Sequence, residues 1–222
     1  MQNHFYIALK YSVVKLIYNL KKLVHSLIIH DISRDTLTCE VYEGDPQTTV
    51  DRLKSIENGD DCNLSAISLC THTGTHIDAP LHFCSDGSSV TDIRLNTFTG
   101  KCTVVTVSGI LTGEDMDKIL AKSRKKLLLH GNSGAFISAF AARVLADSSV
   151  VLIGTDAQSI APDYDEEATH KILAEAGIVI MENLDLSDIA DGDYEIFAFP
   201  IKLGGLEAAP CRAILFEQER GL

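Results

Sequence analysis

Short apolar runs alternate with helical patterns along the chain from Leu27 onward. Six of these runs are rich in Val, Ile, Leu and Phe, the composition of buried or half-buried strands. They are Thr103–Val107, Lys126–Leu129, Val150–Gly154, Gly177–Met181, Tyr194–Phe199 and Arg212–Phe216. Helical patterns lie between them at Glu114–Lys122, Ser138–Ala146 and Glu166–Ala176, and Gly177 suits a left-handed helix end. The pattern predicts a single α/β domain.

The first 28 residues have a different pattern, in which lysines interrupt apolar stretches and no acid occurs. Apolar residues recur there at helical spacings of three and four: Leu9, Val13, Leu16, Leu20, Val24 and Leu27. We expect residues 1–28 to form a helical extension and residues 29–222 to form the domain. A helix packed on this protein or on a sister subunit is favoured over a membrane-surface helix, and an upstream translation start is a further alternative. The lysines argue against a signal peptide and a spanning helix.

Charge and cysteine usage narrow the class of protein. The 222 residues include 19 Lys and Arg against 31 Asp and Glu, a net charge of −12. Such a surface repels phosphate backbones, so we expect no nucleic-acid partner. The six cysteines are scattered without a CxxC pair, and a chain of this length buries a core without disulfides. Reduced thiols and a cytoplasmic location are therefore expected.

Three histidines fall within eleven residues, in the segment Thr-His-Thr-Gly-Thr-His-Ile-Asp-Ala-Pro-Leu-His-Phe at 71–83. His72, His76 and Asp78 offer two imidazole nitrogens and one carboxylate to zinc, manganese or iron. Gly74 and Pro80 argue against a helix there, so we expect an extended or turning segment, and a fully extended strand would place all three on one face. His82 lies just beyond this ligand set and is a candidate proton-transfer group. Three hydrogen-bonded histidines on a polar loop would be the ordinary alternative, but this crowding favours a metal site.

The segment resembles the signature His-x-Gly-Thr-His-x-Asp-x-Pro-x-His of the cyclase-type metal-dependent hydrolases, the family of bacterial kynurenine formamidase and isatin hydrolase. The matching residues are His72, Gly74, Thr75, His76, Asp78, Pro80 and His82. The resemblance extends from about Asp31 to the C-terminus. Its further blocks are Asp31–Ser33, Val41–Pro46, Ile153–Ile160, Thr169–His170, Met181–Leu184, Phe199–Lys202 and Pro210–Arg212.

The resemblance implies a swivelling β/β/α fold with a mixed sheet, and a homodimer or homotetramer with active sites near the subunit contact. It also implies that a second metal is held by Asp78 together with His170 and Glu182. The site would then hold one or two divalent ions, zinc or manganese. Without the family, His170 is an ordinary polar helix residue and Glu182 an exposed acid after a strand.

Two blocks depart from the family pattern. Tyr42 and Glu43 stand where the family often has Trp-Pro, and the element Asp-Ser/Thr-Pro-Ser is replaced by residues 156–159, Asp-Ala-Gln-Ser. Because the family aromatic lines the substrate pocket, these changes bear on which acyl or aryl group is accepted. Tyr42 and Phe83 are candidates to flank an aromatic substrate, although either could equally be a core residue.

These features together predict a metal-dependent amide hydrolase resembling arylformamidase, which converts N-formylkynurenine to kynurenine and formate in tryptophan catabolism. Metal-bound hydroxide would attack the carbonyl, and His82 would pass a proton to the departing nitrogen. An isatin-hydrolase-like enzyme acting on a cyclic amide or lactone is the alternative within the family. A non-catalytic metal-binding member of the fold is the alternative from another class.

Overall fold

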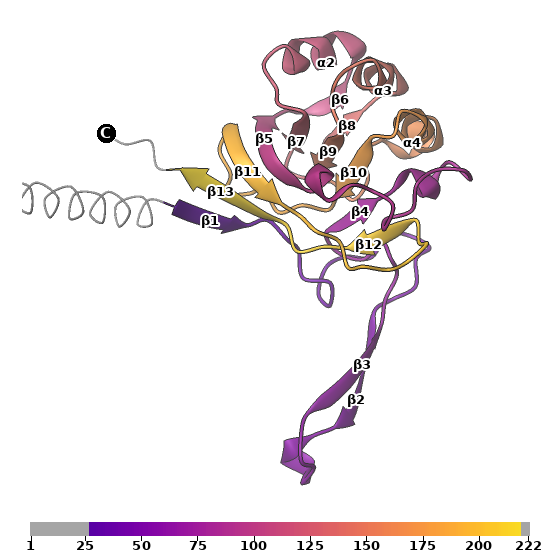
Figure 1. The fold of residues 1–222 in the computed structure, drawn as a ribbon, viewed down its shortest axis with the longest axis vertical. Coiled ribbons are helices and arrows are strands. Elements are labelled where there is room, and N and C mark those ends of the chain that lie inside the picture. The colour runs from indigo at the N-terminus through magenta and orange to yellow at the C-terminus, as the bar shows by residue number, and fades with distance from the viewer. Residues whose placement is uncertain (1–26, 219–222) are drawn as a thin grey trace, which may run out of the picture.

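The computed structural model describes residues 27–218, and the helical extension expected for residues 1–28 lies almost wholly outside them. A nine-stranded mixed sheet forms the body, in the order β1-β13-β11-β5-β7-β9-β10-β4-β12 (Figure 1). Its strands are β1 Leu27–Asp31, β4 His76–Asp78, β5 Thr99–Thr106, β7 Lys126–His130, β9 Leu152–Thr155, β10 Val179–Glu182, β11 Gly192–Phe197, β12 Ala208–Pro210 and β13 Ile214–Gln218. The mixed sheet in one α/β domain confirms the expected fold class.

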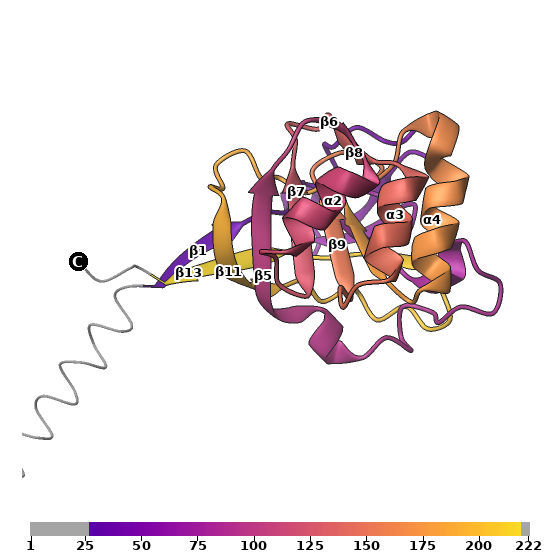
Figure 2. The same cartoon turned by 90° about the horizontal axis from the view of Figure 1, so that it is seen from above.

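The four central strands β5, β7, β9 and β10 run parallel and are covered on both faces. Strand β7 is a continuous apolar run because both of its faces are buried. Leu127 and Leu129 pack into the core on one face of the sheet, and Leu128 packs into the core on the other face. Three helices, α2 (Gly113–Leu120), α3 (Ala139–Ala146) and α4 (Glu166–Glu175), lie side by side over one face of these strands (Figure 2).

Two of these helices begin at side-chain caps. Thr112 and Asp115 form a reciprocal capping box at the start of α2, and Ser138 accepts a hydrogen bond from the backbone of Ala141 at the start of α3. Gly177 follows Ala176, the C-cap residue of α4, and has φ +71°. This is the left-handed conformation that a glycine at the end of a helix was expected to adopt.

Strands β2 (Thr49–Lys54) and β3 (Leu64–Ser68) form a separate antiparallel hairpin that extends away from the body (Figure 1). Every residue of both strands is exposed. We call residues 49–68 the arm. A second small sheet pairs β6 (Gly109–Leu111) with β8 (Ala135–Ile137) in parallel. The sequence patterns predicted neither of these pairs.

All six predicted strands and all three predicted helices are present, with ends displaced by up to four residues. The segment from His72 to Asp78 combines the two expected forms, because residues 71–75 form turns and bends and only His76–Asp78 is a strand, so the one-face arrangement of a fully extended strand does not occur. All six cysteines are free thiols. Within residues 27–218, no helix has both the length and the apolar character needed to cross a bilayer.

Candidate metal centre

Strand β4 and the turn before it position the histidine cluster. Gly74 has φ +67°, and a Cβ atom there would lie 2.8 Å from Cγ2 and 3.2 Å from Cα of Thr36. Glycine is therefore required at position 74, both because it adopts a positive φ without strain and because a side chain there would collide with Thr36. The turn folds the chain back, so that Nδ1 of His72 lies 3.0 Å from Oδ1 of Asp78. Proximity of these two groups thus arises from a reversal of the chain, and not from an extended strand.

Strand pairing brings the remaining acid to the same place. β4 pairs antiparallel with β10, and His76 lies directly opposite Glu182 in the register. Nε2 of His76 is 3.4 Å from Oδ1 of Asp78 and 3.5 Å from Oε2 of Glu182. His170 reaches Glu182 from helix α4, with Nε2 3.2 Å from Oε1. Two residues from distant parts of the chain therefore join the cluster begun by the histidine segment.

Backbone carbonyls orient two of the imidazoles. Nδ1 of His76 lies 2.9 Å from the carbonyl oxygen of Gly74, and Nδ1 of His170 lies 2.9 Å from that of Glu166. In the neutral tautomer whose proton is on Nδ1, that nitrogen donates to the carbonyl. Nε2 then carries a lone pair, which points toward the carboxylates and is available to a metal ion. Metal-ligating histidines in proteins are typically held in this way, with the second nitrogen hydrogen-bonded.

Asp78 is 2% exposed, and neither of its carboxylate oxygens has a partner of hydrogen-bond geometry in residues 27–218. Nε2 of His76 is a buried orphan as well. A buried carboxylate without such partners is costly unless a cation compensates its charge. This set of orphaned nitrogen and oxygen atoms fits a divalent cation, which binds imidazole and carboxylate together.

Charges within the cluster shift its pKa values. Burial opposes the protonated form of His76, yet the Asp78 and Glu182 carboxylates outweigh it and raise its pKa to about 9. Burial likewise opposes protonation of His170, but its contact with Glu182 raises its pKa to about 9. Burial works against the charge of Asp78, but His76 and His72 hold its pKa well below the usual range. Without a metal the cluster therefore retains protons, which a cation would displace.

The possible ligand atoms form two triads that share one carboxylate. His72, Asp78 and His82 make one triad, and His76, Asp78 and Glu182 make the other, with ligand atoms within 4.8 Å of one another in each. His82 thus lies inside a triad, not only beyond the ligand set as its place in the sequence suggested. Its ring centroid is 4.3 Å from that of His72.

The cluster opens into a cavity of about 210 Å³. Its lining includes every sequence-predicted site residue except Asp78, together with Asp45 and Gln158 from two family-like blocks and Glu166, which the sequence did not single out. Phe83 stacks on His170 with ring centroids 4.7 Å apart and meets the His82 ring edge-on at 4.4 Å. Phe83 and His82 lie at the one-turn helix Pro80–His82, which packs against α4.

Glu166 links the wall of this cavity to a neighbouring loop. Its carboxylate accepts hydrogen bonds from the hydroxyl groups of Tyr42, at 3.1 and 3.2 Å, and of Ser159, at 2.9 Å. Burial and the adjacent Glu166 charge raise the pKa of Tyr42 to about 12, so the phenol keeps its proton. The only sequence signal for Glu166 is its place four residues before His170, which puts both on one helix face.

Comparisons with known proteins agree with this geometry. Residues 28–162 match the family described as Putative cyclase. A kynurenine formamidase of Bacillus anthracis is 33% identical over 187 residues, covering 78% of this chain and 90% of that protein. A solved structure, described as a potential metal-dependent hydrolase with cyclase activity, is 31% identical with a TM-score of 0.75, covering 87% of this chain and 99% of that one.

A more distant likeness concerns the fold. Isatin hydrolase A of Labrenzia aggregata, solved with benzyl benzoate bound, has a TM-score of 0.77 and covers 94% of this chain and 100% of its own. Its sequence is only 18% identical, so this likeness shows a shared architecture and carries no statement about substrate.

Proposed function

This chain belongs to the Putative cyclase family of metal-dependent hydrolases, and we propose that it hydrolyses the amide bond of N-formylkynurenine to give kynurenine and formate. The observation that carries the proposal is the buried Asp78 carboxylate, which has no partner of hydrogen-bond geometry among residues 27–218 although nitrogens of His72 and His76 lie 3.0 and 3.4 Å from it, and which belongs to both possible ligand triads. The 33% identity to a kynurenine formamidase over most of both chains supports the choice of substrate.

His72, His76, Asp78, His170 and Glu182 would hold one or two ions, and two ions would share Asp78, which lies close to His72 on one side and to His76 and Glu182 on the other. Zinc and manganese both suit this mixture of imidazole and carboxylate ligands. When bound, such a cation makes water a nucleophile near neutral pH and polarises the amide carbonyl. The protein contributes a buried site in which each ligand is already oriented.

His82 is the proposed proton-transfer group. Burial lowers its pKa, so the ring is neutral at pH 7 and able to accept a proton. Hydrolysis adds water to the formyl carbon and breaks the bond from that carbon to the aniline nitrogen. The proton lost by the water would pass to His82 and then to the departing nitrogen, which leaves poorly without it. A nitrogen of His82 also lies within reach of the His72 and Asp78 ligand atoms, and we assign this ring to proton transfer because it is the member of that triad that lies beyond the His72, His76 and Asp78 set in the sequence.

Tyr42 and Phe83 would bind the aromatic ring of the substrate. Both line the cavity above the histidine and carboxylate cluster, and Phe83 already stacks on an imidazole. The Tyr42 hydroxyl already donates its hydrogen bond to Glu166, so it is not free to donate to a ligand. The aromatic ring of Tyr42 would therefore contact the substrate through its face or edge.

We also propose that the protein is a homodimer and that the arm forms part of the contact. An isolated two-stranded hairpin is marginally stable in water. Val50 and Ile67 are paired across the arm and are 46% and 56% exposed, and Leu53, Ile56 and Leu64 are exposed as well. A second copy that covers this apolar surface would stabilise the arm.

Purified protein reconstituted with zinc or manganese, assayed against N-formylkynurenine, isatin and simple lactones, tests the function. We expect the highest kcat/KM with N-formylkynurenine. Preference for isatin would favour the cyclic-amide hydrolase, whose fold this chain shares. Failure to turn over any of them with metal fully bound would favour a non-catalytic metal-binding protein.

A further inference from the structure

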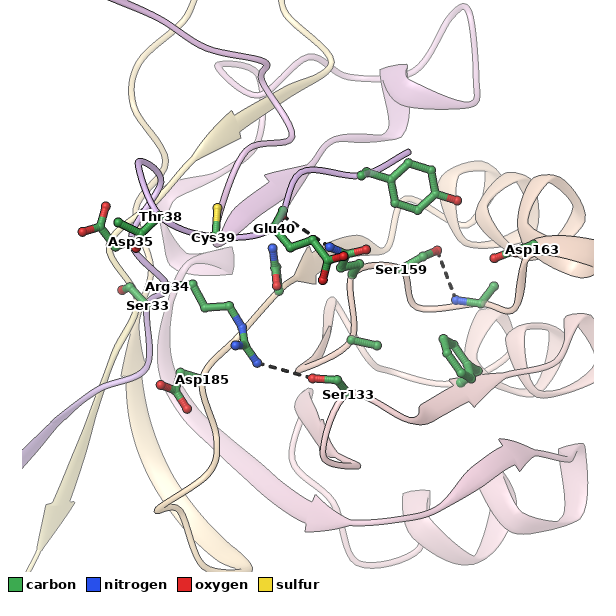
Figure 3. A pocket seen from close by; sticks show the side chains of 16 residues that line it. Ser33, Arg34, Asp35, Thr38, Cys39, Glu40, Ser133, Ser159, Asp163 and Asp185 are labelled. Carbon is green, nitrogen blue, oxygen red and sulfur yellow. Dashed lines mark hydrogen bonds between the residues drawn. The ribbon is translucent and has the colours of Figure 1, made fainter. Parts of the chain in front are cut away.

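A second, larger cavity of about 600 Å³ lies beside the metal centre and shares Tyr42 and Gln158 with its lining. Figure 3 shows its side chains. Its floor comes from the segments that follow β7, β9 and β10, represented by Ser133, Ala157 and Asn183. In parallel α/β sheets, ligands bind outside the carboxyl ends of the strands, which is the place of this cavity.

The Arg34 side chain crosses this cavity and is held by neutral acceptors. Nε donates to the carbonyl oxygen of Leu184 at 3.1 Å, while Nη2 lies 3.4 Å from Oγ of Ser133 and 3.5 Å from the carbonyl oxygen of Asp156 (Figure 3). Within residues 27–218, Arg34 forms no ion pair and its Nη1 donates to no acceptor. A fixed guanidinium with two free donors is suited to bind a carboxylate.

Four acids share this lining, so a simple anion would be a poor ligand. Asp35 and Asp185 are engaged in their own turns, where they accept hydrogen bonds from the backbone of Leu37 and from Ser187. The carboxylates of Glu40 and Asp163 have no hydrogen-bond partner among the described residues and are exposed to the cavity. The hydrogen bond from Ser187 and, less strongly, the charge of Arg34 hold the pKa of Asp185 below its usual range, so the Arg34 charge is partly balanced while its Nη1 donors stay open to a ligand.

We propose that this second cavity binds the α-amino-acid end of the substrate, with Arg34 on the carboxylate and Glu40 on the ammonium group. This inference rests on the proposed function, because it places the formamide in the adjoining metal cavity. Arg34 then determines specificity, since it distinguishes a formanilide that carries an amino acid from isatin, which has neither charged group. Tyr42 and Gln158 line both cavities, so a ligand that spans them would pass beside these two side chains.

The test compares N-formylkynurenine with N-formyl-2-aminoacetophenone, which keeps the formanilide but lacks the amino acid. For the metal-loaded full chain we expect a higher kcat/KM with N-formylkynurenine. Arg34→Gln should lower the ratio of the two kcat/KM values at least about tenfold, the loss expected for a hydrogen bond to a charged group, and mainly through KM. Arg143→Gln, on the exposed side of α3, is the matched control and should leave the ratio unchanged.

An equal loss on both substrates would mean that Arg34 only positions the loops it bridges, and would overturn the proposal. Because Arg34→Gln also removes structural hydrogen bonds, Glu40→Gln is a second variant, whose exposed carboxylate supports no fold contact. It should raise KM for N-formylkynurenine and not for the neutral analogue. An unchanged KM for both would contradict the ammonium site.

Calorimetric binding of L-kynurenine and 2-aminoacetophenone separates this inference from the proposed function. Tighter binding of kynurenine that is lost in Arg34→Gln would support the second cavity even in a protein without formamidase activity. Equal affinity for the two compounds, or kynurenine binding that survives in Arg34→Gln, would overturn the inference while leaving hydrolysis at the metal centre intact.

Discussion

Gly74→Ala tests the claim that a left-handed turn assembles the metal centre. An alanine at φ +67° costs about 1–2 kcal/mol from conformation alone. Its Cβ would also lie 2.8 Å from Cγ2 and 3.2 Å from Cα of Thr36, and crowding against backbone costs about 1–3 kcal/mol more. We expect the free energy of unfolding to fall by about 2–5 kcal/mol, measured by urea denaturation of the metal-free protein.

Gly177→Ala is the matched control, because Gly177 has φ +71° and no atom within 4 Å of the added Cβ. It should lose only the conformational part, about 1–2 kcal/mol. Gly74→Ala should also weaken metal binding, since the Gly74 carbonyl orients His76. Equal destabilisation by the two substitutions, with metal affinity retained in both, would refute the crowding argument and the placement of the turn.

Three further predictions concern chemistry, protonation and assembly. His82→Ala should keep its metal content but lose about 10²–10⁴ in kcat, and an unchanged rate would eliminate its proton-transfer role. In the metal-free protein, the pKa values of His76 and His170 lie near 9 instead of 6.5, so their protonation stabilises the fold below pH 6.5. That stability should be lost as pH rises from 6.5 to 9, and a flat profile of unfolding free energy would contradict the assignment. Ile67→Asp should convert the proposed dimer to a monomer in analytical ultracentrifugation, whereas Ala66→Asp on the opposite face of the arm should not. Equal behaviour of the two variants, or a monomeric unsubstituted protein, would contradict the arm contact.

The central strands were predictable because each is buried on both faces. Leu127, Leu128 and Leu129 fill two cores, so their sequence is an apolar run that only a covered parallel strand tolerates. The arm was not predictable in the same way, because its apolar residues face solvent in the single chain. Strand β12 has only three residues, too few for a period-two pattern.

The residues of the candidate site also divide into those that a local sequence pattern indicates and those that only the folded structure brings together. His72, His76 and Asp78 lie close together in sequence, and their donor chemistry alone indicated a metal. His170 and Glu182 are about a hundred residues away and were assigned only through the family resemblance, since neither carries a local signal of burial. The structure finds them 2% and 5% exposed, brought in by helix α4 and by the pairing of β10 with β4. Glu166 and Arg34 depend wholly on tertiary contacts and were missed, whereas Gln158 lies in the segment 156–159 that departs from the family pattern and was expected to bear on the substrate.

Formate release from N-formylkynurenine during titration of metal-free protein with zinc or manganese tests the central claim most directly. We predict no activity without metal, a rise to saturation as metal binds, and loss of both binding and activity in Asp78→Asn, whose amide cannot replace the shared carboxylate. Turnover by the metal-free protein, or full metal binding and activity in Asp78→Asn, would contradict the account.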